Sequence, residues 1–190
     1  MLAALRDAGP PESLQRNPPR TLDLMSETDE IAYVPMLFGY SNYARPGFRP
    51  RLIRFTGVPA VDGESRGGIL GGAGVAISAR TRHPEAAAAY AAYVASPDVQ
   101  RGVYFDGGGQ PGHRAAWRDE RVNAAASNFF RDTLDALDRA YLRPRYHGFM
   151  EAQERSGEMV HAWLAEGGSA DGLLDRLDAL YRESEPAGKE

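Results

Sequence analysis

The longest apolar run of the chain constrains its fold more than any other feature. It extends from residue 68 to residue 79, contains four glycines, and is too short to span a bilayer. Residues 69–78 of this run have the length and composition of a buried β-strand with a glycine-rich entry. The alanine-rich stretch that follows, residues 84–95, begins with proline, which is typical of the first position of a helix. A strand followed by a helix favours an α/β fold with a parallel sheet.

The rest of the chain predicts two further strands and several helices. Strands are expected over residues 30–38 and 51–58, and Pro35 places the first of them at a sheet edge or ends it there. Helices are expected over residues 1–8, 21–26, 96–105, 122–142, 149–165 and from Ser169 to a charged tail at 184–190. Three strands make a thin sheet for so many helices, and the first helix begins without a cap. The chain is therefore expected to be part of a larger protein.

Composition and charge exclude several classes of function. The 190 residues are 43% hydrophobic and 25% charged, which allows one domain or two small lobes with a core. A net charge of −4 without a long basic patch argues against nucleic acid and anionic membranes as partners. The absence of cysteine excludes disulfides, thiolate metal sites and a cysteine nucleophile. The first apolar stretch is interrupted by Arg6 and Asp7 and is too short for a signal peptide.

No catalytic or metal-binding pattern stands out. The four histidines are not paired at i, i+4 and do not have the spacing of metal ligands. No serine lies in a Gly-x-Ser-x-Gly elbow. The glycines of residues 71–74 lead into more strand rather than into a helix, so they do not form a phosphate-binding loop. The sequence predicts a protein that is not an enzyme and that holds no metal and no cofactor.

An aromatic cluster is the first of the features that favour binding of a small molecule. Its members lie at a strand end and in the following loop: Tyr33, Phe38, Tyr40 and Tyr43, with Phe48 close by. Flat rings at such an edge suit stacking against the apolar face of a sugar. Packing within the core and the loop explains the same rings equally well.

Glycine segments and one arginine corner complete the set of candidates. Gly71 and Gly72 allow a ligand or another backbone to approach closely, or they form a simple turn or bulge. Residues 107–111, a glycine run followed by Gln110 and a proline, suit a hinge or crossover, or a plain loop. Arg145, in the corner of residues 143–146, offers guanidinium donors to a sugar or takes part in a surface salt bridge.

Taken in order, these segments resemble the C-terminal part of the extracellular solute-binding proteins of bacterial carbohydrate ABC transporters. The matching stretches are residues 30–35, 38–43, 70–78, the helix that begins at His83, and residues 96–100, 108–111 and 142–146. The resemblance implies a periplasmic-binding-protein-like α/β fold with two lobes. Residues 1–68 and 112–190 would then belong to the second lobe, and residues 69–111 to the crossover and an incomplete first lobe. The implied ligand-binding residues are Phe38, Tyr40, Tyr43, Gly71, Gly72 and Arg145.

The function that this resemblance implies is that of a substrate-binding component of an ABC importer, present as a fragment. Its partners would be a sugar or polyol and the membrane permease subunits, and its location periplasmic or extracytoplasmic. The helix of residues 84–95 would have lost much of its sheet, so that its apolar face is exposed or covered by self-association. One alternative is a stand-alone domain that binds small molecules or proteins. A carbohydrate-active enzyme is the least favoured alternative, because no suitable carboxylate pair is evident.

Overall fold

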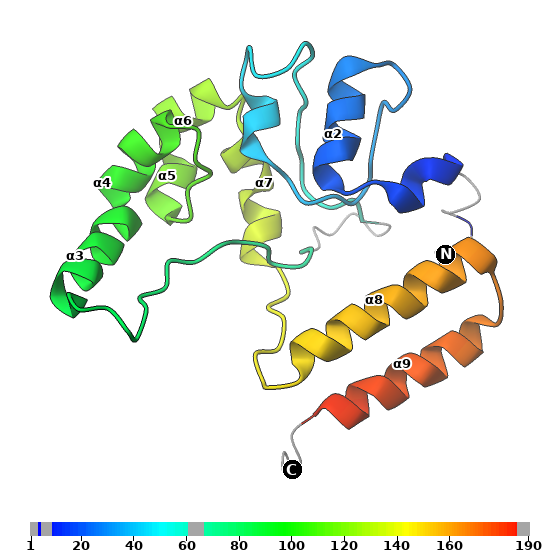
Figure 1. Cartoon of the computed structure of the whole chain (residues 1–190). Coiled ribbons are helices and arrows are strands. Elements are labelled where there is room, and N and C mark those ends of the chain that lie inside the picture. The colour runs from blue at the N-terminus through cyan, green and yellow to red at the C-terminus, as the bar shows by residue number, and fades with distance from the viewer. Residues whose placement is uncertain (1–3, 5–8, 61–66, 186–190) are drawn as a thin grey trace. The chain divides into compact units, whose positions relative to one another are not determined.

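The described residues form a helical protein without a β-sheet. The computed structural model describes residue 4 and residues 9–60 and 67–185 (Figure 1). It is 56% helical and 2% strand. The expected α/β, periplasmic-binding-protein-like fold is therefore wrong for this part of the chain. Most of the helix expected over residues 1–8, and the end of the charged tail, lie outside the described residues.

The helical segments are distributed over two compact units. In chain order they are η1 (Pro11–Gln15), α2 (Pro18–Glu27), η2 (Ser41–Ala44), α3 (Pro84–Ala95), α4 (Pro97–Val99), the π-helical η3 (Gln100–Tyr104), α5 (Arg114–Arg118), α6 (Glu120–Ala125), α7 (Phe129–Asp138), α8 (Phe149–Glu166) and α9 (Ala170–Ser184). The larger unit contains Pro18–Leu142, and the smaller unit contains Met1–Asn17 with Arg143–Glu190. These units have other bounds than the expected lobes, and the assignment of residues to two lobes stays a prediction.

The expected strands do not find partner strands. In the described chain, residues 30–38 and 51–57 are irregular, Val58 is a bridge residue, and residues 69–78 make a single bridge, between Ile69 and Tyr141. At this bridge the Leu70 amide donates to the Tyr141 carbonyl at 2.9 Å. A β-strand is stabilised by hydrogen bonds to a neighbouring strand, so an apolar run that has no neighbouring strand stays irregular. Every residue from 71 to 80 is exposed, which contradicts the expectation of a buried strand.

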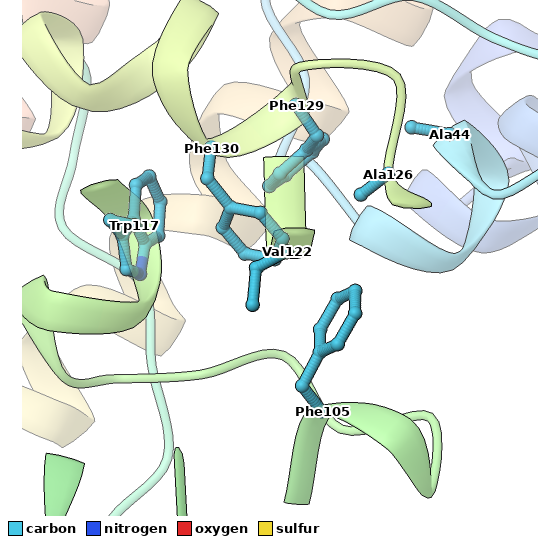
Figure 2. Packing of buried hydrophobic residues seen from close by; sticks show 7 residues of the cluster. All are labelled: Ala44, Phe105, Trp117, Val122, Ala126, Phe129 and Phe130. Carbon is cyan, nitrogen blue, oxygen red and sulfur yellow. The ribbon is translucent and has the colours of Figure 1, made fainter. Parts of the chain in front are cut away.

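Aromatic side chains from several helices form the core of the larger unit (Figure 2). Phe130 is fully buried and meets Trp117 edge-to-face, with 5.1 Å between ring centroids. Phe129 meets Phe130 in the same way, again at 5.1 Å. The buried members of this core are Ala44, Phe105, Trp117, Val122, Ala126, Phe129 and Phe130. A second cluster of Leu22, Tyr43 and Ile53 is joined to the first through Phe55.

A break divides the single helix that was expected over residues 122–142. Helix α6 ends at Ala125 and α7 begins at Phe129, with Ser127 and Asn128 between them at φ of 48° and 63°. In a continuous helix the Arg131 amide would bond to the Ser127 carbonyl, whereas here it donates to Oδ1 of Asn123 at 2.8 Å. Phe129 and Phe130 lie in the first turn of α7 and are both buried in the core. The expected continuous helix is wrong because it is interrupted at residues 126–128.

The smaller unit contains a helical hairpin, in which one helix ends and the next begins at the expected glycine and serine residues. Helices α8 and α9 are separated by Gly167 and Gly168, both with positive φ. The Ser169 hydroxyl accepts a hydrogen bond from the Gly172 amide at 3.1 Å, which confirms the expected N-cap. The hairpin buries three apolar side chains, Ala152, Leu173 and Leu180.

The helix expected over residues 84–95 is confirmed as α3, with the same bounds. Residues 97–105 are helical as expected, but Ser96 does not cap them. Its hydroxyl donates backwards to the Tyr93 carbonyl at 2.7 Å instead of accepting from the next turn.

Candidate functional site

The loop of residues 38–41 is fixed directly on the aromatic core. A Cβ on Gly39 would lie 3.1 Å from two carbons of the Phe129 ring, so glycine allows the backbone to approach this ring closely. Because Phe129 is buried in the core, the backbone between Phe38 and Tyr40 lies directly against the core. Phe38 is 47% exposed and Tyr40 is 43% exposed, so both present ring surface to solvent.

Gly71 lies against the ring of Phe38. A Cβ at this glycine would be only 2.9 Å from Cε1 of Phe38, a distance that real Cβ atoms do not reach. The close approach therefore depends on glycine at this position. Gly72 has no atom within 4 Å of the corresponding position and faces open space.

Gln110 connects the glycine-rich loop to the aromatic loop. Its Oε1 accepts a hydrogen bond from the Ser41 amide at 2.7 Å, and its Nε2 donates to the Gly39 carbonyl at 3.3 Å. A primary amide is suited to this task because it can accept and donate at once. Gln110 thus holds the loop of residues 38–41 by two hydrogen bonds, although it lies about 70 residues away from this loop in the sequence.

Arg45 holds the glycine-rich loop of residues 107–111 from inside the larger unit. Its guanidinium donates to the carbonyls of Phe105 at 2.9 Å and Gly109 at 3.0 Å, and it stacks over the Phe105 ring at 4.0 Å. Burial lowers the pKa of Arg45, which nevertheless stays charged because an arginine is not deprotonated in proteins. The sequence analysis did not identify Gln110 or Arg45 as positioning residues. The feature of the sequence that marks Gln110 is its place as a polar residue between a glycine run and a proline.

Three segments that stood out in the sequence thus come together in the larger unit. We call Phe38, Tyr40, Gly71 and Gln110 the ring site. Its surface is aromatic, and its backbone is fixed by hydrogen bonds and by two close glycine contacts. Two exposed rings next to amide groups can stack on the apolar face of a small molecule.

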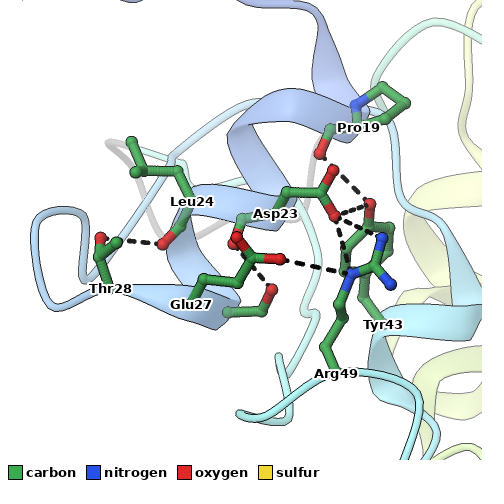
Figure 3. A network of polar contacts seen from close by, with 8 residues as sticks. Pro19, Asp23, Leu24, Glu27, Thr28, Tyr43 and Arg49 are labelled. Carbon is green, nitrogen blue, oxygen red and sulfur yellow. Dashed lines mark hydrogen bonds and ion pairs between the residues drawn. The ribbon is translucent and has the colours of Figure 1, made fainter.

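Tyr43, although expected in the ligand site, has a structural role (Figure 3). Its side chain is buried, and its hydroxyl donates to Oδ1 of Asp23 at 2.8 Å. Arg49 contacts the same oxygen at 2.9 Å. The hydrogen bond from Tyr43 lowers the pKa of Asp23, with help from Arg49, and burial raises the pKa of Tyr43. Tyr43 offers no open face to a ligand, so we do not include it in the ring site.

Arg145 belongs to the smaller unit, where it is exposed. Its neighbours are used locally: Arg143 donates to Gln153 at 3.0 Å, and the Tyr146 hydroxyl bonds to Ser184 at 2.9 Å. The expected contact of Arg145 with a ligand stays a prediction.

Two of the four histidines contact backbone groups. His113 accepts from the Ala115 amide at 3.1 Å, and His161 bonds to the Leu14 carbonyl at 3.0 Å. Within the described ranges, no group of three or more His, Asp or Glu side chains is placed to hold a metal ion. None of the described helices is long and apolar enough to cross a membrane.

Comparisons with known proteins give no relative. No protein-family model matches the sequence. Searches of curated proteins and of solved structures likewise return no match. The resemblance to solute-binding proteins therefore stays a prediction that rests on sequence segments.

Proposed function

We propose that this chain binds a sugar or a related polyol at the ring site. In the wider proposal it is part of the substrate-binding component of a bacterial ABC importer. The observation that carries the proposal is the convergence of Phe38, Gly71 and Gln110, which come from three separate segments. The proposal of sugar binding rests on these side chains and does not depend on a two-lobed α/β fold, whereas the wider proposal rests on the sequence resemblance.

The chemistry of the ring site favours a sugar over a charged ligand. The exposed rings of Phe38 and Tyr40 can lie against the C–H face of a pyranose, while the Tyr40 hydroxyl can bond to a sugar hydroxyl. An aromatic contact contributes about 0.5–1.5 kcal/mol beyond the area that it buries. Two such rings on an open surface support weak binding, with an expected Kd of about 1 mM, equivalent to about −4.1 kcal/mol.

The test is a titration of the purified chain with a panel of monosaccharides, disaccharides and polyols, followed by NMR chemical shifts. We expect saturable shifts for at least one sugar. Phe38→Ala and Tyr40→Ala should each weaken its binding about tenfold, which corresponds to about 1.4 kcal/mol. Tyr181→Ala is the matched control, because this tyrosine of α9 has the same exposed fraction as Tyr40, 43%.

Two results would contradict the proposal. One is the absence of any saturable shift at about 50 mM sugar, where a ligand with a Kd of about 1 mM would be almost fully bound. The other is an equal loss of affinity in Tyr181→Ala, which would show that the ring site is not where the sugar binds.

A further inference from the structure

Every second residue between positions 37 and 41 faces the interior of the larger unit. Leu37 packs against the second core cluster, and Ser41 is only 1% exposed. Between them, Gly39 lies against the buried ring of Phe129. Successive side chains of an extended chain point to opposite sides, so this alternation indicates an extended backbone. The residues between these positions therefore share the outer face.

The outer face of this segment carries two aromatic rings in a row. Met36, Phe38 and Tyr40 are all exposed, and Tyr40 has extended backbone angles, with φ of −119° and ψ of 110°. The hydrogen bonds of Gln110 hold the backbone on both sides of Tyr40. Alternate residues of an extended chain are about 6.5 Å apart. The rings of Phe38 and Tyr40 therefore leave the backbone as neighbours along one line.

This spacing decides how much of a sugar chain the ring site can contact. A pyranose and a phenyl ring both have six members, so a pyranose that stacks on one ring covers that ring and not its neighbour. A monosaccharide thus leaves either Phe38 or Tyr40 without a contact. Two adjacent units of an oligosaccharide, one on each ring, bury both.

Each ring also has free hydrogen-bonding groups beside it. The Tyr40 hydroxyl forms no hydrogen bond in the described structure. At Phe38 the backbone of Gly71 lies against the ring, and within the described ranges its amide and carbonyl have no partner. Sugar hydroxyls both donate and accept, so they can satisfy these groups, whereas a purely apolar ligand would leave them unpaired.

Resting on the proposed function, we infer that the ring site binds two adjacent units of an extended oligosaccharide. One pyranose stacks on Phe38, with the Gly71 backbone beside it, and the next stacks on Tyr40, beside the hydroxyl of that side chain. The ligand class is therefore a linear sugar chain rather than a monosaccharide or a short polyol. Met36 continues the row but has no ring, and the chain turns into η2 after Tyr40, so two units fill the site.

The test measures affinity along a series of increasing chain length. The full chain is titrated, with NMR detection, against β-1,4-linked oligomers of glucose, mannose and xylose, whose equatorial linkages keep the units in an extended line. Each series runs from the monosaccharide to the tetrasaccharide. We expect the disaccharide to bind about tenfold more tightly than the monosaccharide, because it gains the second ring contact. Longer oligomers should gain less than about threefold more.

Single substitutions test whether each ring holds one unit. Phe38→Ala and Tyr40→Ala should each lower the affinity for the disaccharide about tenfold, to that of the monosaccharide. Monosaccharide binding should fall only about twofold, because the other ring remains. A merely structural role would lower both affinities alike. Tyr93→Ala, at an exposed tyrosine of α3, is the matched control in the same unit and should keep the tenfold gain.

The inference and the proposed function fail in different ways. Equal affinities for monosaccharide and disaccharide overturn the inference alone, as does a monosaccharide that binds while none of the oligomers does. A tenfold gain that continues with each unit up to the tetrasaccharide also overturns it, because two rings cannot supply that gain. If no sugar binds at all, the proposed function fails, and the inference fails with it.

Discussion

Replacing Asn123 by alanine should destabilise the larger unit strongly, although the side chain is small and uncharged. Asn123 is 1% exposed, in α6. Its Nδ2 donates to the carbonyls of Trp117 at 2.9 Å and Asp119 at 3.0 Å, and its Oδ1 accepts from the Arg131 amide at 2.8 Å. One side chain therefore holds together α5, the α6 cap and the first turn of α7.

The expected magnitude follows from the groups that lose their partner. The Asp119 carbonyl keeps a hydrogen bond from the Asn123 backbone amide, but the Trp117 carbonyl and the Arg131 amide lose their hydrogen bonds to the Asn123 side chain. Each unsatisfied buried group costs about 1–3 kcal/mol. The loss in free energy of unfolding should therefore be about 3 kcal/mol, a large part of the stability of a small domain.

Urea unfolding followed by tryptophan fluorescence measures this loss. Trp117 lies in the core of the larger unit, so a Trp163→Phe background makes it the only tryptophan and removes the signal of the smaller unit. Asn128→Gly serves as control, because Asn128 has φ of 63°, which glycine adopts without strain. It should change the stability by less than about 1 kcal/mol. A loss below about 1 kcal/mol for Asn123→Ala would refute the view that this side chain bridges the helix break.

Other contacts give further testable expectations. Ser41→Ala should leave the stability unchanged or raise it slightly in urea unfolding, because the Ser41 hydroxyl oxygen is buried without a hydrogen-bond partner in the described structure. Ser169→Ala should cost about 1 kcal/mol of helix stability, measured by thermal unfolding followed by circular dichroism, because it removes the cap of α9. The pKa of Asp23 is lowered below its usual 3.8, so its stabilising effect is present above pH 3.8 and is lost as the pH falls through the lowered pKa. The difference in free energy of unfolding between the native chain and Asp23→Asn should thus be constant near neutral pH and shrink in acid.

The ring site was only partly accessible to sequence reasoning. The exposed rings, the close glycine and the glycine–glutamine–proline loop each stood out as separate segments. Tyr43 looked like the other tyrosines of its cluster until its hydroxyl was found bonded to Asp23 inside the unit. Gln110 became a positioning residue because it bonds to Ser41, which is 69 residues away along the chain. Sequence periodicity carries no information about a contact over such a separation.

Local chemistry alone determined the helices that begin and end at strong signals. Helix α3 begins at Pro84 and ends before Ser96, and Ser169 caps α9. The geometry of proline and the capping by a hydroxyl both act within a few residues. The absence of a sheet was decided at the tertiary level, since an apolar run becomes a strand only beside a partner. The interruption between α6 and α7 was decided by tertiary structure as well, because the Asn123 side chain bonds to the Trp117 carbonyl and to the Arg131 amide across two residues with positive φ.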